Sequence, residues 1–109
     1  MKKIKKLVRD NIPDIIIANG RQPKIKIIKG HDLLLALNEK LVEEHEEYIS
    51  EPDNNKSVEE LADMFEVIIC LAKNKGFNRE DFLKLAQSKA LKNGSFDKGY
   101  FYEGDEENK

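Results

Sequence analysis

The sequence predicts an all-α protein made of four helices. Two long stretches carry apolar residues at helical spacing, residues that favour helix ends flank four segments, and only two short pieces favour extended backbone. The 109 residues suffice for one domain with a modest hydrophobic core. We therefore expect a single domain over residues 1–103, followed by an acidic, disordered tail at 104–109.

The first expected helix is short. It begins near Asn11, with Pro13 in its opening turn. It ends at Gly20, because glycine commonly follows the last residue of a helix. Residues 24–29 then alternate charged side chains with isoleucine, which favours a short extended segment.

The second expected helix opens at His31 or Asp32 and ends before Pro52. The third uses Ser57 as its N-cap and stops at Gly76. Apolar residues cover most of the circumference of this third helix, which is a large apolar area for so short a chain. We therefore expect a homodimer or a higher homo-oligomer.

The fourth expected helix follows its cap Asn78 and runs to about Asn93, just before Gly94. Beyond it, residues 99–103 contain three aromatic side chains and form the second piece that favours extended backbone.

The composition argues against several classes of partner. The net charge is only −2, which gives no general attraction to nucleic acid. Cys70 is the single cysteine, so it has no partner for an intrachain disulfide, and the basic start lacks the apolar core of a signal segment. No apolar run approaches the roughly 20 residues that a membrane helix needs. We expect a cytoplasmic protein that binds neither nucleic acid nor membrane.

Two pairs of carboxylates at i,i+3 spacing lie on the second and third expected helices. On the second helix, Glu44 falls on the apolar side and Glu47 at the margin of that side. On the third, Glu60 and Asp63 project among apolar residues instead of into the narrow polar strip. All four acids are therefore expected where side chains pack.

A group of buried carboxylates needs a compensating cation, because each unpaired charge is costly to desolvate and the charges repel one another. Oxygen ligands on rigid helices suit Mg²⁺, which keeps several waters and binds substrate phosphates. The four acids thus predict a Mg²⁺ site and a phosphate ester or anhydride substrate. Their alternative role is a salt-bridge network with Lys or Arg, and Glu60 has a second one in a capping box that starts at Ser57.

The spacing of the acids also resembles a known family. Glu43, Glu44 and Glu47 form an EExxE motif, and Glu60 and Asp63 form an ExxD motif. The opening segment KLVRDNIPDII is similar to the KLVRDKIPEII start of a small subgroup of that family. Together these segments resemble the MazG-like, all-α nucleoside triphosphate pyrophosphohydrolase superfamily, which includes phosphoribosyl-ATP pyrophosphohydrolase.

The resemblance implies a MazG-like four-helix bundle whose helices pair across subunits. It also implies Mg²⁺-dependent hydrolysis of the α–β phosphoanhydride of a nucleotide to a monophosphate and pyrophosphate, often as a house-cleaning reaction, with Mn²⁺ as an alternative ion. The metal ligands that it implies are Glu44, Glu47, Glu60 and Asp63. Glu43 would support its neighbours.

Such hydrolysis requires an activated water and neutralised phosphates. Either Glu44 or Glu47 is the candidate catalytic group that orients or deprotonates the water. The candidate phosphate contacts are cations near the two ends of the chain, namely Lys6, Arg9, Lys89 and Lys92. Asp10 and Phe96 are candidate supporting residues, the first by orienting Arg9 and the second by stacking on a base. A mobile basic arm and contacts with a helix dipole are the alternative roles of these cations.

Two other functional classes compete with this interpretation. A non-catalytic helical module would use the apolar third helix to bind a partner. A di-iron carboxylate bundle would need Glu-x-x-His pairs, but His45 directly follows Glu44 and no such pair occurs.

The MazG-like family also ends in a basic-Gly-Gly-Phe turn, from which Asn93 and Ser95 depart. The motifs do not encode which base and sugar are recognised.

Overall fold

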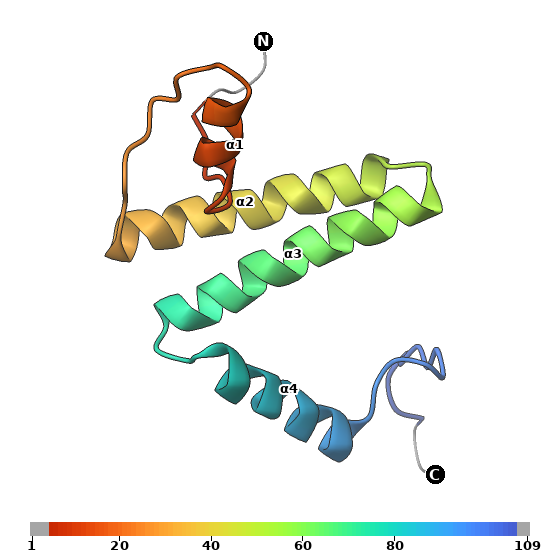
Figure 1. The fold of residues 1–109 in the computed structure, drawn as a ribbon. Coiled ribbons are helices and arrows are strands. Elements are labelled where there is room, and N and C mark those ends of the chain that lie inside the picture. The colour runs from red at the N-terminus through yellow and green to blue at the C-terminus, as the bar shows by residue number, and fades with distance from the viewer. Residues whose placement is uncertain (1–4, 107–109) are drawn as a thin grey trace.

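The computed structural model describes residues 5–106 and contains four helices, with no strand in that range (Figure 1). The helices are α1 (Ile12–Ala18), α2 (Gly30–Ser50), α3 (Asn54–Asn74) and α4 (Arg79–Asn93). The all-α prediction is confirmed. Residues 24–29 and 99–103, the two pieces expected to favour extended backbone, have no regular secondary structure.

Two helices end in the same glycine-containing turn. After α1, the N–H of Gly20 donates to the carbonyl of Ile17, and the N–H of Arg21 reaches back to Ile16. After α3, the N–H of Gly76 donates to the carbonyl of Lys73, and the N–H of Phe77 donates to the carbonyl of Ala72. Both glycines have φ near +90°, which other residues rarely adopt. The predicted ends of these two helices are confirmed.

The start of α3 corrects the sequence prediction. The helix begins at Asn54, and its cap is Asp53, whose Oδ2 accepts a hydrogen bond from the N–H of Lys56 at 2.9 Å. Ser57 therefore lies inside the helix and neither caps it nor opens a capping box with Glu60. The polar run of residues 53–56 thus supplies the cap and the solvent-exposed first turn of α3.

The hydrophobic core lies between α2 and α3, which form an antiparallel pair. Its buried apolar residues are Leu37 of α2 and Val67, Ile69 and Ala72 of α3, and Ile69 is fully buried. At one end of the pair, the Nδ2 of Asn74 donates to the carbonyl of Gly30 at 3.2 Å. This pairing places the second half of α2 beside the first half of α3, where the two acidic motifs lie.

The other two helices pack less closely. α1 stands across the first half of α2, whereas α4 turns away from the pair after Gly76 (Figure 1). The radius of gyration is 18.8 Å, against about 13 Å for a compact chain of this length. The described chain is thus an elongated helical hairpin with two appended helices, and a closed MazG-like bundle stays a prediction.

Among the described residues, no helix combines the length and the apolar character needed to cross a membrane.

Candidate metal centre and adjoining pocket

Three of the four predicted metal ligands converge. One carboxylate oxygen from each of Glu44, Glu47 and Glu60 lies within 4.8 Å of the other two. The i,i+3 spacing puts Glu44 and Glu47 on one side of α2, and the antiparallel pairing brings Glu60 of α3 opposite them. Glu44 is only 6% exposed and is the one buried charged residue in the described range, as its place on the apolar side predicted.

Two oxygens of this carboxylate group have no hydrogen-bond partner. They are Oε2 of Glu44 and Oε2 of Glu60, and both are inaccessible to solvent. The other oxygen of Glu44 lies 3.3 Å from Nζ of Lys40, which also lies 3.6 Å from Glu43. A buried acceptor without a partner is costly. Lys40 therefore leaves these two oxygens unsatisfied, whereas a cation bound between them would satisfy both.

The pKa values of the carboxylate group also favour a bound cation. Burial is the main cause that raises the pKa of Glu60 to about 7; repulsion from Glu44 and Glu47, and the hydrogen bonds that form among the three groups only when one is protonated, act in the same direction. Burial and the neighbouring Glu44 also raise the pKa of Glu47. Without a counter-charge, the group therefore holds a proton near neutral pH. A bound divalent ion would replace that proton, and oxygen-only donors of this kind suit Mg²⁺ or Mn²⁺.

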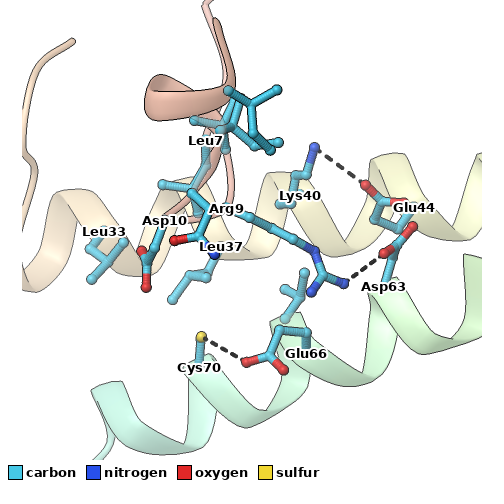
Figure 2. Close-up of a pocket in the computed structure, with 15 residues that line it drawn as sticks. Leu7, Arg9, Asp10, Leu33, Leu37, Lys40, Glu44, Asp63, Glu66 and Cys70 are labelled. Carbon is cyan, nitrogen blue, oxygen red and sulfur yellow. Dashed lines mark hydrogen bonds and ion pairs between the residues drawn. The ribbon is translucent and has the colours of Figure 1, made fainter. Parts of the chain in front are cut away.

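Asp63, the fourth predicted ligand, lies outside this group. Its Oδ1 accepts a 2.6 Å hydrogen bond from Nη2 of Arg9 (Figure 2). Asp63 thus has the salt-bridge role that was the alternative to metal binding. Glu44 has this role in part, through its ion pair with Lys40. The metal-binding role of Asp63 stays a prediction, and so does the phosphate-binding role of Arg9.

A pocket of about 520 Å³ adjoins the carboxylate group (Figure 2). Glu44 and Asp63 stand at one end, and Leu33 and Cys70 at the other. Residues 7–12 and Ile15 of α1 form a third side above α2 and α3. The opening segment singled out by its sequence thus covers a cavity beside the acids.

Among the charged and thiol side chains that line the pocket, three were not predicted as site residues: Lys40, Glu66 and Cys70. Lys40 precedes Glu43 and Glu44 by three and four positions, a spacing at which helical ion pairs form, and this signal was present. Glu66 and Cys70 follow Asp63 by one and two turns of α3. The side of α3 that carries them lines a pocket only because the opening segment docks over it.

Four other predicted residues are not brought to the site within one chain. Lys6 is exposed and lies just before the pocket-lining segment. Lys89 and Lys92 are exposed on the second half of α4, which diverges from the α2–α3 pair. Phe96 follows α4 and is 95% exposed. Asp10, by contrast, lines the pocket. For Lys89, Lys92 and Phe96, contact with substrate would need a second copy of the chain.

Comparison of the chain with protein-family models, with curated proteins and with solved structures found no match. The MazG-like resemblance therefore depends on the motifs themselves.

Proposed function

We propose that the protein is a Mg²⁺-dependent pyrophosphohydrolase that splits a nucleotide into a monophosphate and pyrophosphate. One observation carries the proposal: carboxylates of two helices meet within 4.8 Å, and two of their oxygens are buried without a partner. The pocket beside them has a volume within the range of small-molecule sites. The EExxE and ExxD motifs supply the reaction class.

Each residue has a role in this proposal. Glu44 and Glu60 would hold the ion through their unpartnered oxygens, and exposed Glu47 would be accessible to the water that attacks phosphorus. When bound, the ion neutralises phosphate charge and stabilises the leaving pyrophosphate. Arg9 and Lys40 border the same end of the pocket and add positive charge next to the phosphates.

The test is pyrophosphate release from a nucleotide panel with Mg²⁺ or Mn²⁺. Glu47→Gln keeps the shape of the side chain but removes its basicity, so we expect kcat to fall about a hundredfold or more. Asp63→Asn should lower activity about tenfold or more, because it weakens either a ligand or the group that orients Arg9. Glu46→Gln, an equal charge change on the exposed face of α2, is the matched control.

Equal turnover by the wild type and both variants would contradict the proposed site. Circular dichroism and thermal melting check that each variant is folded.

The second candidate is a non-catalytic helical interaction module. It is favoured by the apolar side chains that α3 leaves exposed, Val58 at 62%, Leu61 at 42% and Phe65 at 41%. Such a module would release no pyrophosphate from any nucleotide, so the same assay separates the two functions.

A further inference from the structure

The pocket is a slot that runs along α3, away from the carboxylate group. Asp63, Glu66, Val67 and Cys70 follow one another on the pocket side of this helix. At 1.5 Å per residue, the distance along the axis from Asp63 to Cys70 is about 10 Å. On α2, the order runs from Glu44 through Leu37 to Leu33. A ligand with phosphates at the acidic end would therefore extend its other end toward Leu33 and Cys70.

Apolar side chains line the middle of the slot. Leu37 on α2 and Val67 on α3 are buried, and Leu7 and Ile12 lie on the third side. Apolar walls with a few polar groups are typical of pockets for heterocycles, where the walls contact the faces of the ring and the polar groups contact its edge. The polar groups of this slot therefore determine which base can present a matching edge and bind.

Among the described residues, six charged side chains line the slot, and four of them form two ion pairs, which leaves Asp10 on the opening segment and Glu66 on α3. Arg9 is bound to Asp63 and Lys40 lies against Glu44, both at the acidic end. Glu66 lies one turn beyond Asp63, and its contacts are weak. Its Oε2 accepts from the Sγ of Cys70 at 3.9 Å, and its Oε1 lies 3.8 Å from Nη1 of Arg79. A thiol is a poor donor, so Glu66 retains capacity to accept.

We propose that Glu66 determines the base specificity of this site by accepting hydrogen bonds from the edge of guanine. This inference rests on the proposed nucleotide hydrolysis. An ionised carboxylate is a pure acceptor with two oxygens. Guanine presents two adjacent donors, N1–H and the 2-amino group, so it pairs with both oxygens at once.

The other bases match Glu66 less well. Adenine and cytosine offer one amino group next to a ring nitrogen that is itself an acceptor. Thymine and uracil offer one N–H flanked by two carbonyl oxygens, which a carboxylate repels. A site built to pair with donors discriminates strongly against bases that lack them.

The kinetic test compares kcat/KM for dGTP, dATP, dCTP and dTTP. We expect the wild type to favour dGTP over dTTP by about tenfold or more. In Glu66→Gln, one oxygen becomes an amide that donates, so the value for dGTP should fall and that for dTTP should rise. Glu46→Gln, which lies outside the slot, should keep the wild-type order.

A binding test needs no turnover. By isothermal titration calorimetry, GMP should bind the wild type about tenfold or more tightly than TMP, and Glu66→Gln should remove the difference. Equal binding of GMP and TMP, or a preference unchanged by Glu66→Gln, would overturn the inference while leaving hydrolysis standing. A Glu66-dependent preference for GMP without hydrolysis of any nucleotide would uphold the role of Glu66 and reject the proposed reaction.

Discussion

Glu60 lies in surroundings that favour its protonated form, and this makes the stability of the metal-free protein depend on pH. Its pKa is about 7 in the folded protein, against an ordinary value of 4.5. Between these two values the folded state holds a proton that the unfolded state has lost. The free energy of unfolding should therefore decrease as pH rises from about 4.5 to about 7.

Thermal melting in EDTA from pH 4.5 to 7.5 measures this dependence. Glu60→Gln cannot ionise, so its curve should be flatter than that of the wild type. Glu47, whose pKa is also raised, remains in that variant, so part of the pH dependence persists there. Parallel curves would show that Glu60 titrates normally.

Binding of a divalent ion should stabilise the fold, because the ion binds carboxylates that only the folded chain brings together. At pH 7.5, millimolar Mn²⁺ should raise the Tm of the wild type and leave that of Glu44→Gln nearly unchanged. Differential scanning fluorimetry suffices for this comparison, with Ca²⁺ as a test of ion selectivity. An equal rise in both proteins would place the ion elsewhere.

The periodicity of the sequence predicted the burial of Glu44, since only a residue on the apolar side of α2 becomes buried by α3. It did not predict the partner of Asp63. Arg9 is 54 positions away, and its contact depends on how the opening segment docks, which no local pattern encodes. The contact of Glu66 with Arg79 of α4 likewise depends on how two helices pack, whereas its contact with Cys70 follows from the i,i+4 spacing within α3.

At the scale of elements, the start of α3 gives a sharp test. Asp53 caps the helix through the N–H of Lys56. Asp53→Ala should therefore lower the free energy of unfolding by about 1 kcal/mol. Ser57→Ala, at the position where the sequence suggested a cap, should have little effect, since alanine is a good helix former. Urea denaturation of both variants distinguishes the two starts, and a larger loss from Ser57→Ala would restore the original prediction.

Element boundaries were predictable where one residue type decides them. The caps and glycines at Asn78, Gly20 and Gly76 have the roles that their chemistry suggested. The start of α3 was not, because Asp53 and Ser57 are both good caps and local sequence does not rank them. The packing of the elements was also out of reach, because the divergence of α4 from the α2–α3 pair depends on contacts remote in sequence.

At the scale of the whole molecule, the elongated shape and the exposed stripe of α3 predict self-association. Val58, Leu61 and Phe65 recur at i, i+3 and i+7, so they form one stripe along α3. We expect light scattering after size-exclusion chromatography to give at least twice the chain mass of 12.6 kDa. Val58→Lys should lower this mass, whereas Ile27→Lys, in the segment between α1 and α2, should not. A monomeric wild type would contradict the expectation.

The order of the pocket walls along the chain has a practical consequence for work with this protein. The segment that covers the slot begins at Leu7, a few positions from the first residue, whereas α4 carries the opposite end of the chain away from the slot. Changes in this segment should therefore affect a bound ligand as directly as changes in α2 or α3. Leu7→Ser should weaken ligand binding, whereas Leu91→Ser on the exposed surface of α4 should not, and a titration of both variants measures what the docked segment contributes.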